Sequence, residues 1–171
     1  MKQPEQYFIQ ENAIYPNSVL PVLHYIGVLD LPWLFPTRYI KNLFSKNNWG
    51  NNWENGIYSF QHYHSITHEV FGVCKGATTL QLGGEDGISI NIQKGDVIII
   101  PAGVAHKNLG DEEQAICVGG YPDGKDFDMN YGNAGERPYT DKVIAALPIP
   151  TSDPVFGQNV GLVTIWKSIA K

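Results

Sequence analysis

The chain has 171 residues, 43% of them hydrophobic and 12% aromatic, which is enough to build the core of one domain without disulfides. Its 12 Lys and Arg against 17 Asp and Glu give a net charge of -5 with no basic cluster, so neither nucleic acid nor an anionic membrane is an expected partner. The chain start has no apolar stretch of signal-peptide length, and no apolar run could span a bilayer. We therefore expect a cytoplasmic protein, and the 18 Gly and 11 Pro favour an all-β fold with many turns.

Residues 1–55 are predicted to form an N-terminal arm of the same domain, because four prolines interrupt its apolar segments and leave room for two short strands. After Pro36, helical spacing predicts a short helix with Thr37 as its N-cap, and the apolar positions are Tyr39, Ile40, Leu43 and Phe44. The Asn-rich stretch 47–56 contains two tryptophans and is predicted to be an ordered loop that leaves this helix.

Residues 56–121 consist of short apolar or alternating runs separated by glycines, which is typical of consecutive antiparallel strands. The runs are IYSFQHYH, EVFGVCKG, ATTLQLGG, GISINIQKG, DVIIIPAG and EQAICVGGY. Their spacing of about 8 to 12 residues indicates a sandwich or barrel. Residues 122–171 are predicted to wrap this barrel and to add an edge strand at LVTIW, and neither a repeat nor a second domain is indicated. Cys74 and Cys117 lie in apolar runs without metal spacing and are predicted to be buried reduced thiols.

Four side chains in the strand-rich core have the spacing of a metal site. His62 and His64 are two residues apart, so on a strand both imidazoles project from the same face. Glu69 follows after four residues, and His106 follows the turn-like PAG. Three imidazoles and one carboxylate suit a single divalent ion such as Fe, Mn, Ni or Zn, and they leave up to two coordination positions open to water or substrate.

At these residues the sequence resembles the cupin superfamily. Its first motif, G(x)5HxH(x)4E(x)6G, is met from Gly56 to Gly76 without a deviation. Its second motif, G(x)5PxGxxH(x)3N, is met from Gly95 to His106, but Gly110 replaces the final Asn, and an Asn stands two residues earlier at Asn108. Strings such as PAGVAHKNLG and LPIPTSDPVFG resemble an uncharacterised subfamily of YjlB-like cupins.

The resemblance implies a single-domain jelly-roll β-barrel, metal ligands at His62, His64, Glu69 and His106, and a homodimer. It implies no substrate, because the subfamily has no activity that can be carried over. The metal site alone leaves three possibilities open. These are an enzyme of dioxygenase, decarboxylase or isomerase type acting on a small oxygen-rich metabolite, a metal-assisted binding protein for a small molecule without catalysis, and a structural or storage barrel with a closed coordination shell.

Several other residues are weaker candidates. Alternation around the ligands, or a position near the barrel mouth, suggests a substrate-lining role for Tyr58, Phe60, Phe71, Asn108 and Tyr121, although core packing accounts for the same periodicity. Asp126 and Asp128 follow in a loop that could reach the barrel mouth. His68 and His24 are predicted to be structural, because His68 should face away from Glu69 and His24 has no partner at ligand spacing.

Overall fold

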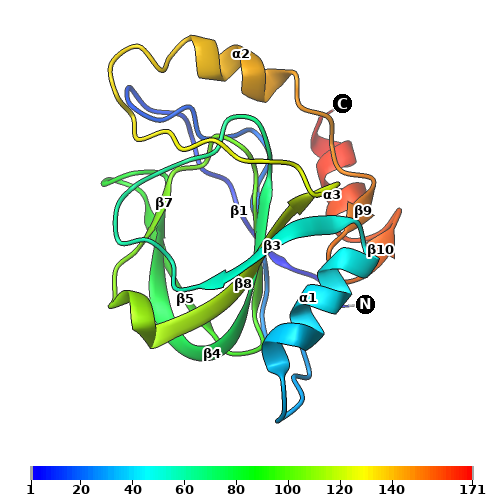
Figure 1. The fold of residues 1–171 in the computed structure, drawn as a ribbon. Coiled ribbons are helices and arrows are strands. Elements are labelled where there is room, and N and C mark those ends of the chain that lie inside the picture. Colours follow the sequence, from blue (N-terminus) through cyan, green and yellow to red (C-terminus); the bar gives the residue numbers. More distant parts are fainter. Residues whose placement is uncertain (1, 171) are drawn as a thin grey trace.

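The computed structural model describes residues 2–170, and most of its regular structure is antiparallel β-sheet (Figure 1). The strands are β1 Glu5–Tyr7, β2 Val22–Tyr25, β3 Trp49–Asn55, β4 Glu69–Leu82, β5 Ile88–Gln93, β6 Val97–Ile100, β7 His106–Asn108, β8 Ala115–Pro122, β9 Ser152–Asp153 and β10 Gly157–Gln158. The helices are α1 Pro36–Lys46, α2 Tyr139–Ala145 and α3 Leu162–Ile169, with a short 3-10 turn at Glu112–Gln114. The main sheet follows the order β1-β2-β6-β4-β8-β3, while β5 and β7 pair with β4.

Strand β4 joins the two halves of the barrel. Its first half pairs with β6 and β8, and its second half pairs with β5 and β7. An irregularity between Val73 and Lys75 interrupts the pairing with β8. It moves the inward-facing positions from odd numbers, such as Phe71, to even numbers, such as Leu80. One strand therefore bends around the barrel and lines it at both ends.

Two hydrophobic clusters cover the two faces of the main sheet. One fills the barrel interior and includes Phe71, Ile98 and Leu80. The other lies between the outer face of the sheet and the helices α1 and α3, where Phe44 and Trp166 are fully buried. In Figure 1 these two helices lie on one side of the barrel and α2 crosses one end of it. Strand β6 contributes to both clusters, which explains its uninterrupted run of apolar residues.

The sequence predicted the all-β fold and the helix of the N-terminal arm, but not the other two helices. LVTIW was wrongly predicted to be an edge strand, because it belongs to α3 and buries Leu162, Val163 and Trp166 at helical spacing. Helix α1 begins at Pro36 rather than after an N-cap at Thr37, and Phe35 precedes it in a left-handed conformation. Within residues 2–170, no helix is both long and apolar enough to cross a membrane.

One loop prediction and two strand predictions were also wrong. The Asn-rich stretch forms β3, an edge strand paired with β8, rather than a loop. EVFGVCKG and ATTLQLGG are one continuous strand, β4. The run IYSFQHYH is not a regular strand, because its pairing is limited to isolated bridges at His62 and Tyr63.

A buried carboxylate fastens the N-terminal arm to the barrel. Asp96 accepts hydrogen bonds from His24 Nε2 at 3.0 Å, from the Gly27 backbone N–H at 2.7 Å and from the Gln93 backbone N–H at 2.9 Å. This places His24, as predicted, in a structural role. Burial acts to raise the pKa of Asp96, but these donors outweigh it and lower the pKa below 3.8.

Asp96→Asn is expected to lower the free energy of unfolding at pH 7 by about 1–3 kcal/mol, because buried donors lose a charged acceptor. A carboxylate with a depressed pKa stabilises the fold above its unfolded pKa, and the contribution is lost as the pH falls through the folded pKa. Urea unfolding between pH 7 and pH 2.5 should therefore show a shallower acid loss in the variant than in the wild type below pH 3.8. An equal acid slope in both proteins would contradict this assignment.

Candidate metal centre

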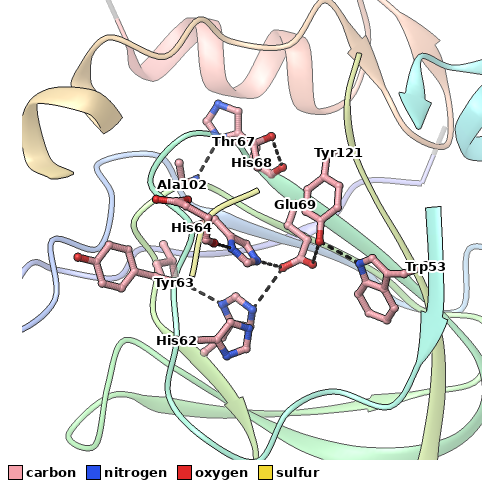
Figure 2. Close-up of polar contacts among 12 residues, drawn as sticks. Trp53, His62, Tyr63, His64, Thr67, His68, Glu69, Ala102 and Tyr121 are labelled. Atoms are coloured by element: carbon pink, nitrogen blue, oxygen red, sulfur yellow. Dashed lines mark hydrogen bonds and ion pairs between the residues drawn. The ribbon is translucent and has the colours of Figure 1, made fainter. Parts of the chain in front are cut away.

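Three buried histidines meet inside the barrel mouth, and they come from two segments far apart in the sequence (Figure 2). His62 and His106 form a backbone bridge in which each N–H donates to the carbonyl of the other residue, at 3.2 and 2.9 Å. His64 lies two residues further along. One ring nitrogen from each of the three histidines lies within 4.8 Å of the others. A full strand was predicted to project His62 and His64 from the same face. Extended backbone at His62 and Tyr63, supported only by isolated bridges, is sufficient for this.

The tautomer of each imidazole follows from its backbone contact. Nδ1 faces a backbone carbonyl in all three rings, namely that of Phe60 for His62, Asp128 for His64 and Val104 for His106. Because a carbonyl only accepts, each Nδ1 carries a proton and donates it. The Nε2 atom of a neutral ring is then left with a free lone pair, and this arrangement is the usual support of a metal-bound histidine.

Glu69, the first residue of β4, places a carboxylate beside two of the three rings. Its Oε2 lies 3.2 Å from His64 Nε2 and 3.3 Å from His106 Nε2, and both partners are buried. When both rings are neutral with Nδ1 protonated, these contacts bring acceptors together without a hydrogen between them, and Oε2 has no hydrogen-bond partner within the described residues. A positive charge resolves this arrangement, and the donor set of three imidazoles and one carboxylate fits a divalent metal ion.

The pKa shifts within the cluster also favour a bound positive charge. Burial and the neighbouring His106 lower the pKa of His62 to about 3, so this ring is neutral at pH 7. Burial acts to raise the pKa of Glu69, but His64 and His106 hold it well below its usual value. Burial acts to lower the pKa of His64, yet Glu69 outweighs it and raises the pKa. The carboxylate therefore stays ionised and attracts positive charge to its histidine neighbours.

Two residues of neighbouring strands orient the carboxylate. Tyr121 of β8 donates from its hydroxyl to Glu69 Oε1 at 3.2 Å, and Trp53 of β3 donates from Nε1 to the Tyr121 hydroxyl at 3.1 Å. Oε1 is thereby occupied, and Oε2 is directed at the histidines (Figure 2). The contribution of Trp53 was not anticipated from the sequence.

Residues 127–136, here named the strap, are part of the connection between β8 and α2, and they pair with the segment that carries His62 and His64 through an antiparallel bridge between Tyr63 and Asn130. Asp128 anchors the strap, because its carboxylate accepts from the Ser65 backbone N–H at 2.7 Å, the Ser65 hydroxyl at 2.6 Å and Asn130 Nδ2 at 2.7 Å. Its backbone carbonyl accepts from His64 Nδ1. Asp128, one of the two loop carboxylates that could reach the barrel mouth, therefore holds a proposed ligand in place through its backbone carbonyl.

Asp128→Ala is expected to weaken divalent metal binding by about tenfold, because loss of outer-sphere support of a ligand costs roughly 10- to 100-fold in metal affinity. Isothermal titration with Zn²⁺ or Co²⁺ measures this change. Asp126→Ala is the matched control, since Asp126 is exposed and its carboxylate has one long contact of 3.4 Å with Asn51. Equal affinities in the two variants would exclude the anchoring role.

A cavity of about 240 Å³ lies above the four side chains and reaches the surface between β3, the strap and residues 56–58. Of the residues predicted to line it, Tyr58, Phe71 and Tyr121 do so. Phe60 is not among the lining residues and stacks on Tyr58 instead. The prediction for Asn108 does not fit either. Its buried side chain accepts from the Thr78 hydroxyl and the Gly110 backbone N–H, so it braces the turn in which the motif Asn is replaced.

The remaining candidates have structural positions. His68 points away from the cluster, accepts from the Ala102 backbone N–H at 3.0 Å and packs on Trp166 of α3. Asp126 is exposed and does not line the cavity. Phe127 and Met129 of the strap do line it, and sequence reasoning missed both. The only available signal was their place beside Asp126 and Asp128, which were expected near the mouth.

The antiparallel barrel and its internal histidine cluster define a cupin. The sequence profile of the cupin domain matches residues 54–118. The chain is 32% identical over 166 residues to the uncharacterised protein YjlB of Bacillus subtilis (strain 168), and the match spans 96% of this chain and 98% of YjlB. The chain therefore belongs to the cupin superfamily, among the YjlB-like proteins.

Solved structures with a similar fold are more distant. An acireductone dioxygenase from Bacillus anthracis, with a cadmium ion in its active centre, is 16% identical and aligns with a TM-score of 0.40 over 58% of this chain and 77% of that chain. An oxalate decarboxylase is 24% identical, with a TM-score of 0.35 over 57% of this chain and 24% of that chain. At this distance neither likeness says anything about activity.

Proposed function

We propose that this protein is a metal-dependent enzyme of dioxygenase, decarboxylase or isomerase type that acts on a small oxygen-rich metabolite. The observation that carries the proposal is the convergence of three histidine nitrogens in the wall of a cavity that reaches solvent, with the unpartnered Oε2 of Glu69 beside two of them, those of His64 and His106. His62, His64, His106 and Glu69 would hold the ion. A ligand set of four leaves coordination positions that face the cavity free for substrate.

Residues around the proposed metal site either orient the Glu69 carboxylate or form the walls of the cavity. A bound divalent ion supplies Lewis acidity and, if it is iron or manganese, oxygen chemistry as well. Tyr121 and Trp53 keep the Glu69 carboxylate in one orientation. Phe71 and Phe127 give the cavity apolar walls that limit the access of water to the bound substrate.

A second candidate, metal-assisted binding of a small molecule without turnover, is favoured by one observation. Apart from Glu69, the acidic residue among the described residues that line the cavity is Glu54, and it is exposed and pairs with Lys41 at 3.0 Å. A buried carboxylate base separate from the ligand set is therefore missing from the described wall. Enzyme chemistry here would have to rely on the metal and on Tyr121.

The test starts from protein purified without a polyhistidine tag, stripped with a chelator and reloaded with Fe²⁺, Mn²⁺, Ni²⁺ or Zn²⁺. Each form is screened with sugar acids, diketones and phenolics, following oxygen uptake and substrate loss. The proposal predicts turnover that depends on one metal and disappears in Glu69→Ala. Ligands that stabilise the loaded protein against heat but are recovered unchanged from every form would favour the binding function instead.

A further inference from the structure

The size of the cavity limits which ligands can reach the proposed metal site. About 240 Å³ lies below the range of roughly 300 to 1,000 Å³ that is typical of pockets for drug-sized ligands. One six-membered ring with a few substituents fits this space, whereas a disaccharide or a nucleotide does not.

Two stacked aromatic pairs flank the histidines. In the first pair Tyr58 stacks on Phe60 at 4.8 Å and 18°, and Tyr58 meets the His62 ring in a T-shaped contact at 5.5 Å. In the second pair Phe127 stacks on Tyr121 at 5.0 Å and 21°, and Phe127 contacts the His64 ring at 5.2 Å. Tyr58 and Phe127 both line the cavity, yet they are 44% and 43% exposed. Large aromatic surfaces that face a small cavity are suited to contact a flat apolar ligand.

The charges of the wall restrict the ligand further. Within residues 2–170, the cavity is lined by Glu54 and Glu69 but by neither Lys nor Arg. A divalent ion with one carboxylate ligand has a net charge of +1, so a single anionic group on the ligand neutralises the centre. A second anionic group would meet no cation in this wall, and a buried unpaired charge is strongly unfavourable.

Three asparagines at the rim already make hydrogen bonds with the protein itself. The Asn52 amide donates to the carbonyls of Trp49 and Gly119, and the Asn51 amide donates to the carbonyl of Lys125. The Asn55 side-chain oxygen accepts from the Gly56 backbone N–H. Recognition of a sugar needs several free donors and acceptors around the ring. The internal contacts of Asn51, Asn52 and Asn55 reduce the number of rim groups free for a sugar, which disfavours the sugar acids among the oxygen-rich candidates.

From these observations we infer that the site takes a compact aromatic ligand with a single negative charge. Its oxygen atoms bind the metal, and its ring lies between Tyr58 and Phe127. The inference rests on the metal site of the proposed function and narrows its substrate class from oxygen-rich metabolites in general to monoanionic aromatic chelators. It makes Tyr58 and Phe127 the residues that determine specificity.

The test uses two probes with the same metal-binding group and the same charge when bound. Benzohydroxamate carries a phenyl ring, and acetohydroxamate carries a methyl group in its place. Both are titrated into the full-length Co²⁺-loaded protein, and the visible cobalt spectrum reports binding. Wild type is expected to bind benzohydroxamate about tenfold more tightly or better, since ring burial and aromatic contact each add affinity. Adding a second charge, as in 4-carboxybenzohydroxamate, is expected to weaken binding by about fivefold.

Tyr58→Leu and Phe127→Leu should each reduce the preference for benzohydroxamate by about threefold or more. Both side chains are partly exposed, at 44% and 43%, and neither belongs to a buried core cluster, so either variant should fold. Tyr139→Leu is the matched control, because Tyr139 is 72% exposed on α2 and does not line the cavity, and it should leave the preference unchanged.

Azide separates the two proposals, because it needs only an open metal position and makes no use of aromatic walls. If azide changes the cobalt spectrum while the two hydroxamates bind equally well, the inference on the ligand is overturned and the open metal site stands. Equal binding of the singly and doubly charged aromatic probes overturns the charge argument. If cobalt is not retained, or azide has no effect, both proposals fail.

Discussion

His64→Ala is expected to lower the affinity for divalent metal by at least about 100-fold, the upper end of what losing an outer-sphere partner costs. The physical reason is that His64 supplies one of the three converging nitrogens and is the ring closest to Glu69, with Nε2 3.2 Å from Oε2. Metal content after dialysis, together with competition against a coloured chelator, measures the loss. His62→Ala and His106→Ala should each lower the metal affinity by a similar factor.

The control for this series is His68→Gln. His68 is as buried as the ligand histidines and adjoins Glu69, but its ring packs on Trp166 and accepts from the Ala102 backbone N–H. This variant should lose thermal stability and retain its metal. A wild-type level of metal in His64→Ala, or loss of metal in His68→Gln at a temperature where it is folded, would argue against the assigned ligands.

Gly76→Ala is expected to destabilise the fold by at least about 3 kcal/mol, which places it among the largest single-residue effects. Gly76 has a φ of 74°, and a Cβ atom there would lie 1.7 Å from the Gln114 carbonyl oxygen. Because that oxygen belongs to the backbone, the contact cannot be relieved by a side-chain rotation. Thermal unfolding of the metal-free protein should show Tm falling by about 10 °C.

Gly135→Ala provides the comparison for Gly76. Gly135 also has a positive φ, 96°, but an added Cβ would meet nothing within 4 Å. Its cost should be limited to backbone strain of about 1 kcal/mol. If the two alanine variants have the same Tm, the close approach of residues 112–114 to the barrel does not limit position 76. Gly56 belongs to the same contact, since its Cβ would lie 2.0 Å from the Glu112 carbonyl oxygen.

The spacing of the metal-site residues could be read from the sequence because it depends on local geometry. Residues two apart in extended backbone face the same way, and this holds at His62 and His64 although only bridges, not a full strand, support them. Glu69 and His106 each begin a strand, as predicted. The homodimer implied by the resemblance stays a prediction.

Helix α3 could not be predicted because a five-residue run such as LVTIW suits a buried strand and a buried helix equally well. What decides is a tertiary contact: the Leu162 backbone N–H donates to Asp153 Oδ2 at 2.8 Å, which satisfies one of the free donors at the helix start. Asp153 lies nine residues earlier, and its carboxylate also accepts from the Tyr25 hydroxyl. No pattern within the helix records this contact.

Strand β3 was not predicted because its local composition disfavours a strand. Asn has a low preference for strands, and the stretch 47–56 contains five of them around two tryptophans. The strand forms because Trp49 is buried against the outer cluster and Trp53 packs on the inner one, while β8 offers a free edge. Similarly, Phe127 enters the cavity from a strap whose course depends on the Asp128 anchor, so alternation within the barrel could not reveal it.

The most direct test of the central claim is a crystal structure of the Co²⁺- or Zn²⁺-loaded protein with an anomalous difference map at the metal edge. We expect one ion bonded to Nε2 of His62, His64 and His106 and to a Glu69 oxygen at about 2.0–2.2 Å, with at least one further position facing the cavity and held by solvent. An ion bound elsewhere, coordination through Nδ1, or a shell completed entirely by protein atoms would contradict it.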